Sequence, residues 1–207
     1  GIDVILSARS ENKLNMLAKE VQDAHGVKAE VIVADLSVQG EAQKLYDQVK
    51  ENGCEVDYLV NNAGFGVYGV FAETDWTAEA NMLNVNIVAL THLTKLFLPD
   101  LIAKRKGRIL NVASTASFQP GPMMSVYFAS KAFVLSFSDA IANELRGTGV
   151  TVTALCPGAT ETGFKSTAGA AGSRLFEMRK LPTGADVAKY GYRAMQKGKR
   201  VAIHGLM

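Results

Sequence analysis

Short apolar runs alternate along the chain with longer stretches in which apolar residues recur every three or four positions. The short runs have the length of buried strands, and the longer stretches have the periodicity of helices. Strands are expected at residues 3–8, 29–34, 56–60, 108–113, 150–156 and 200–204. Helices are expected from near Ser10, whose hydroxyl can cap the first turn, and at about 41–51, 77–98, 124–146 and 184–196. The helix at 77–98 is expected to stop at Pro99.

The expected strands are apolar on both faces and are separated by helices. This pattern indicates a parallel sheet covered on both sides, which is a doubly wound α/β fold. No repeat or linker divides the sequence, so residues 1–207 are expected to form a single domain. Ligands of such sheets bind beyond the carboxyl ends of the strands. The segments expected to gather there are SAR (7–9), ADL (34–36), NNAG (61–64), ASTAS (113–117) and CPG (156–158).

Composition and charge exclude several classes of function. The chain has 207 residues, of which 48% are hydrophobic and 20% are charged, and its net charge is +2. That length buries a full core without a disulfide or a metal. The charge is too small for a surface that neutralises phosphates, and the basic run at 104–108 is interpreted as a solvated loop. No nucleic-acid partner is expected.

The cysteines and histidines do not form a recognisable site. Cys54 and Cys156 do not make a disulfide framework, which suggests a reducing compartment. The histidines lie far apart without acidic partners at ligand spacing, so no metal site is expected. No apolar run approaches the roughly 18 residues of a membrane helix, and the first residues resemble a strand more than a signal peptide. A cytoplasmic protein without a membrane span is therefore expected.

A literal G-x-G-x-x-G pattern occurs at 64–69, after the third expected strand. The residues that follow Gly69 do not begin a helix, so no helix N-terminus is available for a pyrophosphate. The pattern is interpreted as a turn-rich loop that leaves a strand.

Two tyrosines stand four residues before a lysine. Tyr46 and Lys50 share an expected helix without a polar partner at a strand end, and they are interpreted as a helix-surface pair. Tyr127 and Lys131 also lie one helical turn apart, but Ser114 ends the fourth strand shortly before them. The loop between contains QPGP, which can turn the chain back, so these three side chains can face one space.

The three side chains together suit proton transfer at a carbonyl. A free phenol has a pKa of about 10, and a nearby ammonium is expected to lower it. A serine hydroxyl can hold the substrate oxygen beside the phenol, which then protonates an alkoxide or deprotonates an alcohol. The hydride must come from a cofactor, since no side chain supplies one. The alternative is an ordinary helix start with a tyrosine and a partly solvated lysine.

These residues carry a family resemblance. NNAG at 61–64, Ser114, YFASK at 127–131 and PGATET at 157–162 resemble the short-chain dehydrogenase/reductase family in its single-domain branch, with agreement in order and spacing from residue 1 to 207. The resemblance implies a Rossmann-like fold and an NAD(P)-dependent oxidoreductase acting on CH–OH groups. It also implies self-association into a homodimer or homotetramer, through the long helices at 77–98 and 124–146.

The resemblance also implies individual roles. Tyr127 is the acid/base, Ser114 anchors the carbonyl, and Lys131 binds the nicotinamide ribose and tunes Tyr127. Asn86 matches an asparagine that supports a water in the proton relay; taken alone, it would be interpreted as an ordinary polar helix residue. Asn61, Ala63 and Gly64 are expected along the cofactor, Asp35 and Leu36 at the adenine, and Pro157, Gly158 and Thr162 at the nicotinamide carboxamide.

Arg9 bears on the choice of cofactor. An acidic residue closing the first strand would accept hydrogen bonds from a free ribose, but Ala8 and Arg9 stand there instead. A guanidinium suits a 2′-phosphate, so NADP(H) is preferred over NAD(H). The alternative is a surface arginine at the start of a loop.

One departure from the family is large. Its Gly-rich phosphate loop lies between a first strand and a first helix, whereas this chain starts at what resembles the second strand. In a doubly wound sheet the absent strand is the central one, so the strands at 3–8 and 56–60 would face a gap. The sequence is expected to be a fragment, cut before Gly1 and also after Met207. A protein truly lacking that segment is not expected to bind NADP tightly.

The preferred function is an NADP(H)-dependent carbonyl reductase or alcohol dehydrogenase with a small-molecule substrate. ILNVASTASFQPGP and YFASKAFVLSFS resemble ketoacyl and hydroxysteroid reductases, which favours a lipophilic ketone or a 3-oxoacyl thioester. Apolar residues of the loop at 159–181 are expected either to wall the substrate site or to pack that loop: Phe164, Leu175, Phe176 and Met178. The alternative function is a catalytically silent relative that binds nucleotide and acts through protein partners. A serine hydrolase is the least favoured alternative, since the sequence has neither G-x-S-x-G nor a plausible Ser-His-acid order.

Overall fold

The computed structural model describes residues 1–161, 163 and 181–205. The chain forms two compact units, Gly1–Glu55 and Val56–Met207, and each contains its own parallel sheet. The expectation of a single domain over residues 1–207 stays a prediction.

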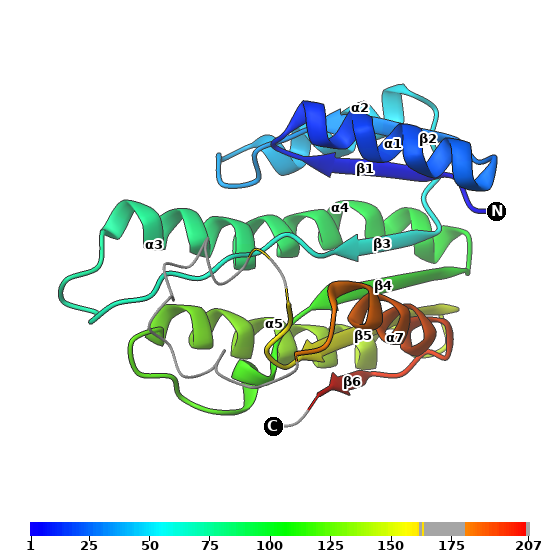
Figure 1. Cartoon of the computed structure of the whole chain (residues 1–207). Helices are drawn as coiled ribbons and strands as arrows, with labels where there is room; N and C mark the ends of the chain where they lie inside the picture. Colours follow the sequence, from blue (N-terminus) through cyan, green and yellow to red (C-terminus); the bar gives the residue numbers. More distant parts are fainter. Residues whose placement is uncertain (162, 164–180, 206–207) are drawn as a thin grey trace. The chain divides into compact units, whose positions relative to one another are not determined.

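The first unit is a pair of parallel strands with two helices (Figure 1). Its elements are β1 (Val4–Ala8), α1 (Glu11–His25), β2 (Ala29–Val33) and α2 (Glu41–Glu51). The two strands pair in register from Val4 with Ala29 to Ala8 with Val33. Ser10 lies at the N-cap of α1 as predicted, but its side chain makes no capping hydrogen bond. Gly26 ends α1 with a left-handed φ of 62°, which glycine adopts without steric cost.

The second unit contains a four-stranded parallel sheet in the order β3-β4-β5-β6 (Figure 1). The strands are β3 (Tyr58–Asn61), β4 (Gly107–Val112), β5 (Val150–Pro157) and β6 (Val201–His204). The helices are α3 (Trp76–Leu83), the π-helix η1 (Asn84–Ala89), α4 (Leu90–Ala103), the 3₁₀ helix η2 (Thr115–Phe118), α5 (Ser125–Glu144) and α7 (Gly184–Gln196). Each described strand follows the sequence-based expectation to within a few residues.

Both faces of this sheet are covered, as the apolar strands predicted. Alternate strand residues such as Ile109 and Ala154 belong to clusters with side chains of α4 and α5. Their neighbours Leu110 and Leu155 cluster instead with α7, through Val187 and other residues. Since successive strand side chains point to opposite faces, α4 and α5 lie on one face of the sheet and α7 on the other.

The predicted end of the long helix at Pro99 is wrong, because α4 continues through this proline to Ala103. Proline removes the hydrogen bond to the carbonyl four residues earlier, which belongs to Lys95. Lys95 and Pro99 are both exposed, so water can satisfy that carbonyl. Leu101, two residues further, is completely buried in the cluster with Ile109, and this burial stabilises the last turn.

The helical run Trp76–Ala103 is long and apolar enough to cross a membrane by length and composition alone, contrary to the sequence-based expectation. Charged residues and a proline interrupt the apolar run, but the mean hydropathy over 18 residues stays high despite them. In the structure 39% of that window is buried, and Leu90, Leu93 and Phe97 belong to the core. A core helix has the same character, so this feature is weak evidence for a membrane span.

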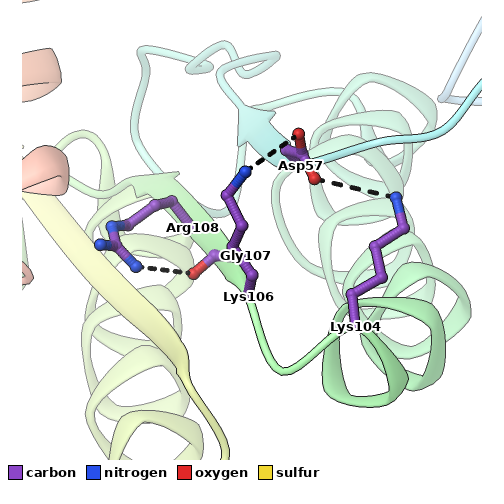
Figure 2. Close-up of polar contacts among 5 residues, drawn as sticks. All are labelled: Asp57, Lys104, Lys106, Gly107 and Arg108. Carbon is purple, nitrogen blue, oxygen red and sulfur yellow. Dashed lines mark hydrogen bonds and ion pairs between the residues drawn. The ribbon is translucent and has the colours of Figure 1, made fainter.

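Two lysines near the end of α4 lie close to one carboxylate (Figure 2). The Nζ atoms of Lys104 and Lys106 lie 3.7 Å from the two carboxylate oxygens of Asp57. Arg108 donates from its guanidinium to the carbonyl of Gly107 at 3.2 Å. The Lys106 side chain is 70% exposed and that of Asp57 43% exposed, so these ion pairs contribute little to stability.

Candidate active site

The carboxyl ends of β3, β4 and β5 carry the segments that the sequence singled out in the second unit. These strands are parallel neighbours, so Asn61–Gly64, Ala113–Ser114 and Pro157–Gly158 leave the sheet at the same edge. A cavity of about 830 Å³ opens there. Its wall includes Gly64, Ser114, Tyr127, Lys131, Pro157 and Gly158.

Ser114 is held by the backbone around it. It is the N-cap of η2, and its Oγ accepts a hydrogen bond from the Ala116 amide at 3.1 Å. The same hydroxyl donates to the carbonyl of Pro157 at 3.4 Å. It also forms a hydrogen bond with the Tyr127 phenol, so the serine and the tyrosine meet as the sequence predicted.

Tyr127 lies in the first turn of α5 and is 9% exposed. Its ring packs edge-on against Phe128, with centroids 6.0 Å apart, in a cluster with Met82, Ala116 and Met124. Burial raises the pKa of the Tyr127 phenol, and the hydrogen bond with Ser114 lowers it by less. The pKa of Tyr127 is therefore raised, whereas the sequence predicted that Lys131 would lower it. The reason is that burial removes the solvent that would stabilise the phenolate.

Lys131 is almost entirely buried beside the tyrosine. Its Nζ lies 5.9 Å from the centroid of the Tyr127 ring and donates to the carbonyl of Val112 at 2.8 Å. Burial lowers the pKa of this ammonium to about 8, although the charge of a Cys156 thiolate would raise it. A Cβ placed on Gly64 would lie 3.2 Å from Nζ, so a residue without a side chain lets the backbone lie close to the ammonium.

Asn86 is fully buried in the π-helical segment and connects two parts of the site. Its Oδ1 accepts from the Phe65 amide at 3.2 Å, and its Nδ2 donates to the Phe65 carbonyl at 3.0 Å. Nδ2 also donates to Ser130 Oγ at 3.0 Å. The side chain therefore ties the loop after β3 to α5, and the predicted role in holding a water stays a prediction.

The side chain of Asn61 does not line the cavity. It is buried, and its Nδ2 donates to Thr94 Oγ1 at 3.1 Å and to Asn111 Oδ1 at 2.9 Å. Asn111 in turn donates to Ser138 Oγ at 2.9 Å. Asn61 and Asn111 are register partners on β3 and β4, so this buried chain of hydrogen bonds fixes two strands against α4 and α5.

The remaining predicted residues of this unit have different positions. Gly64, Pro157 and Gly158 line the cavity, and Gly158 donates its amide to the His204 carbonyl at 2.8 Å. Ala63 is exposed. Thr162 lies outside the described residues, as do Phe164, Leu175, Phe176 and Met178.

Several cavity residues were not found from the sequence. Asn62, Phe65, Gln119, Met124, Phe128, Thr160 and Tyr192 line the wall. Asn62 is the second residue of the NNAG motif, so its neighbours could have indicated it. Tyr192 is an exposed residue of α7, so the amphipathic pattern, which predicts the buried face of that helix, does not indicate it.

Three predicted cofactor residues belong to the first unit. Arg9 is exposed directly after β1, and Asp35 and Leu36 are half-buried beyond the end of β2. Asp35 accepts hydrogen bonds from the Ser37 hydroxyl at 2.7 Å and the Ser37 amide at 3.0 Å. These bonds lower the pKa of Asp35, and the positive charge of Arg9 adds a smaller effect in the same direction.

The cavity residues fit the nicotinamide half of a dinucleotide. An ammonium has three donors, and the structure gives Lys131 one hydrogen-bond acceptor among the described residues, the carbonyl of Val112. A buried ammonium at a cavity wall with donors to spare suits a ribose diol. Gly64 keeps the space beside it open, and Pro157 and Gly158 border the same cavity.

Comparisons with known proteins agree with this geometry. Residues 1–171 match the family model for short chain dehydrogenases. The chain is 37% identical over 164 residues to a very-long-chain 3-oxoacyl-CoA reductase of Anas platyrhynchos, an alignment that covers 76% of this chain and 51% of the relative. It is 35% identical over 162 residues to the 17-beta-hydroxysteroid dehydrogenase type 3 of Mus musculus, covering 76% and 52%. The chain thus spans about half the length of these curated relatives.

A solved structure extends the similarity to nearly the whole chain. The short-chain dehydrogenase from Sphingobium yanoikuyae in complex with NADPH superposes with a TM-score of 0.88 at 29% identity. The match covers 98% of this chain and 78% of that one. The predicted Rossmann-like α/β fold is therefore confirmed.

Proposed function

This chain belongs to the short-chain dehydrogenase/reductase family, and from that premise we propose that it is an NADP(H)-dependent oxidoreductase. It interconverts a ketone and a secondary alcohol. The observation that carries the proposal is the contact between the Ser114 hydroxyl and the Tyr127 phenol, with the Lys131 ammonium 5.9 Å from the phenol ring at the wall of the same cavity.

In this mechanism a bound nicotinamide nucleotide supplies a hydride to the carbonyl carbon, or takes one from the alcohol. Ser114 holds the substrate oxygen, and Tyr127 donates its phenolic proton to that oxygen. Burial raises the pKa of Tyr127, so the phenol remains protonated at neutral pH and is ready to act as an acid. Lys131 stabilises the phenolate left after proton transfer.

Alcohol oxidation requires Tyr127 in its deprotonated form. To oxidise an alcohol, Tyr127 must first lose its proton, and a raised pKa moves that step to higher pH. Carbonyl reduction is therefore expected to dominate near neutral pH and to decline as the pH rises through the pKa of Tyr127. Alcohol oxidation is expected to grow over the same interval.

The choice of NADP(H) over NAD(H) rests on Arg9. Its guanidinium is exposed beyond β1, where a 2′-phosphate can form charge-assisted hydrogen bonds. The related dehydrogenase of Sphingobium yanoikuyae was solved with NADPH. Both observations support NADP(H) as the preferred cofactor.

The substrate is proposed to be a lipophilic ketone, including a 3-oxoacyl thioester. Phe65, Met124 and Phe128 give the cavity wall apolar surface, and burial of apolar substrate area there favours binding. Gln119 is an exposed polar residue of the same wall. The two curated relatives act, by their names, on a 3-oxoacyl thioester and a hydroxysteroid.

The test is NADPH oxidation by the purified protein with a panel of ketones that includes short polar, steroid and 3-oxoacyl members. We expect oxidation that depends on the ketone and is faster with the lipophilic members. Nucleotide binding without turnover on any member would instead support the catalytically silent relative.

A further inference from the structure

Ser117 is a hydroxyl residue next to the site that the proposed reaction does not use. It lies in η2, three residues after Ser114, and is half-buried. Its amide donates to the Ser114 carbonyl at 3.0 Å, and its Oγ donates to the Lys131 carbonyl at 2.7 Å. One residue thus links the backbone of the serine to the backbone of the lysine.

That link joins two elements whose relative position decides the proton transfer. Ser114 precedes η2, whereas Tyr127 and Lys131 belong to α5. A hydrogen bond between two hydroxyl oxygens is confined to about 2.5–3.0 Å, so a small shift of η2 along α5 breaks it. Backbone hydrogen bonds tie the connecting loop at Gly121 and Met123, and the Ser117 bond adds a direct constraint between η2 and α5.

Apolar packing between the two elements is less specific. Ala116 of η2 belongs to the cluster with Met124, Tyr127 and Phe128. Such contacts keep the elements together, but they are non-directional and tolerate sliding better than a hydrogen bond does. The Ser117 bond is short and directional, and it ends on the carbonyl of Lys131 itself.

The Lys131 carbonyl keeps a hydrogen bond even when the bond from Ser117 is lost. Lys131 lies inside α5, where its carbonyl also accepts the amide four residues later in the helical pattern. A carbonyl oxygen has two lone pairs, and Ser117 occupies the second. Loss of the hydroxyl therefore leaves the helix intact and removes a positional constraint.

We propose that Ser117 is a positioning residue that holds Ser114 and Tyr127 in hydrogen-bond contact by fixing η2 against α5. The proposal rests on the proposed function for its kinetic consequence, but the contact itself can be measured without turnover. In the Ser117→Ala variant the bonds of Ser114 to Ala116 and Pro157 remain, but α5 loses its direct hydrogen bond to η2, so the contact between Ser114 and the phenol weakens. Because that contact lowers the pKa of Tyr127, its weakening raises this pKa further.

The kinetic test compares Ser117→Ala, Ser117→Thr and Ser136→Ala. The threonine retains the hydroxyl, and Ser136 is an exposed serine of α5 that serves as a control. For Ser117→Ala we expect kcat for ketone reduction to fall about tenfold, a part of the 10²–10⁴ that proton transfer contributes. The KM for NADPH should stay unchanged, and the alkaline limb of the pH profile should move to higher pH. Ser117→Thr should restore both kcat and the profile, and Ser136→Ala should match the parent protein.

A second measurement is independent of catalysis. Tyrosines labelled with ¹³C at Cζ report phenol ionisation by NMR, and the Tyr127→Phe variant assigns the resonance of Tyr127. The resonance should titrate at higher pH in Ser117→Ala than in the parent, and at the parent pH in Ser117→Thr. An unchanged titration in Ser117→Ala overturns the positioning role, whether or not the protein turns over a ketone.

The two failures are distinguishable. If the parent protein reduces no ketone but Ser117→Ala still shifts the Tyr127 titration, the proposed function fails and the positioning role stands. If turnover is normal in Ser117→Ala and its pH profile is unchanged, the positioning role fails and the proposed function stands.

Discussion

At the scale of single residues, the site keeps two ionisable side chains away from water. Burial lowers the pKa of Lys131 to about 8 and raises that of Tyr127, so each favours its neutral form more than it would in solvent. A neutral phenol is the form that donates a proton. A buried ammonium is the form that stabilises a phenolate, and it costs stability when no anion is present.

The cost at Lys131 predicts a dependence of stability on pH. The unfolded chain holds this proton up to the ordinary lysine pKa of 10.5, whereas the folded chain loses it near pH 8. Between these values the unfolded state binds more protons, so folding stability rises with pH, and below pH 8 the penalty is fully present. A shift of this size corresponds to about 3 kcal/mol, of which the bond to Val112 offsets about 1 kcal/mol.

Lys131→Met removes both the charge and its bond. In the absence of nucleotide we expect the variant to be more stable than the parent by about 2 kcal/mol at pH 7. That advantage should shrink as the pH rises from 8 towards 10.5. Urea denaturation of both proteins across this range measures the difference, with the exposed Lys95→Met as control. A variant that is less stable than the parent at pH 7 would contradict the account.

At the scale of secondary-structure elements, buried hydrogen bonds connect the strands to the helices that carry the site. Asn61 and Asn111 join β3 to β4, and Thr94 and Ser138 connect them to α4 and α5. The hydroxyls of Thr94 and Ser138 donate to carbonyls four residues earlier in their own helices, at 2.8 and 2.6 Å. Every bond in this chain lies in the dry interior, so loss of one partner leaves another group unsatisfied.

Two neighbouring threonines of α4 allow a matched test. Thr94→Val preserves shape but leaves an N–H of Asn61 unpaired, and we expect a loss of about 1–3 kcal/mol in the free energy of unfolding. Thr91 Oγ1 is buried without a hydrogen-bond partner in the described part of the chain. Thr91→Val should therefore be neutral or stabilising. Equal effects of the two substitutions on the urea midpoint would show that this chain of bonds does not contribute as described.

The elements that periodicity specifies could be predicted from the sequence. The helix at 41–51 and the strand beginning at Ala29 have the expected bounds, because propensity and burial agree there. The continuation of α4 past Pro99 could not be predicted, since it depends on tertiary burial of Leu101. The hydrogen bonds of Asn86 to Phe65 and Ser130 could not be predicted either, since these partners are distant in sequence.

The meeting of the three main site residues could be predicted from the sequence, but some of their properties could not. Ser114, Tyr127 and Lys131 meet because strand ends and a helical turn place them, and both features are visible in the sequence. The direction of the Asn61 side chain could not be predicted, since alternation along a strand does not tell which face of the sheet each residue lies on. The rise in the pKa of Tyr127 was also missed, because burial is a property of the folded chain.

At the scale of the whole molecule, the family match extends over both compact units. Residues 1–171 include the whole of Gly1–Glu55 and most of the second unit. The residues predicted for the adenine end lie in the first unit, and those predicted for the nicotinamide end lie in the second. Cofactor selectivity and catalysis can therefore be tested with substitutions in different units.

Arg9→Ala tests selectivity without touching the catalytic residues. Loss of charge-assisted hydrogen bonds to a 2′-phosphate is expected to raise the KM for NADPH about 10- to 100-fold. The KM for NADH and kcat with saturating NADPH should hardly change. Steady-state kinetics with both nucleotides measures this, and Arg146→Ala, an exposed arginine of the second unit, is the control. An equal loss with NADH would show that Arg9 does not read the 2′-phosphate.

The central claim is that the phenol of Tyr127 transfers the proton to the substrate oxygen. Its most direct test is NADPH oxidation by Tyr127→Phe with a ketone that the parent protein reduces, alongside NADPH binding followed by fluorescence. The account predicts a fall in kcat of about 10²–10⁴-fold with nearly unchanged nucleotide affinity, since the variant keeps the ring and loses the donor. Turnover that survives in Tyr127→Phe at the rate of the parent protein would contradict it.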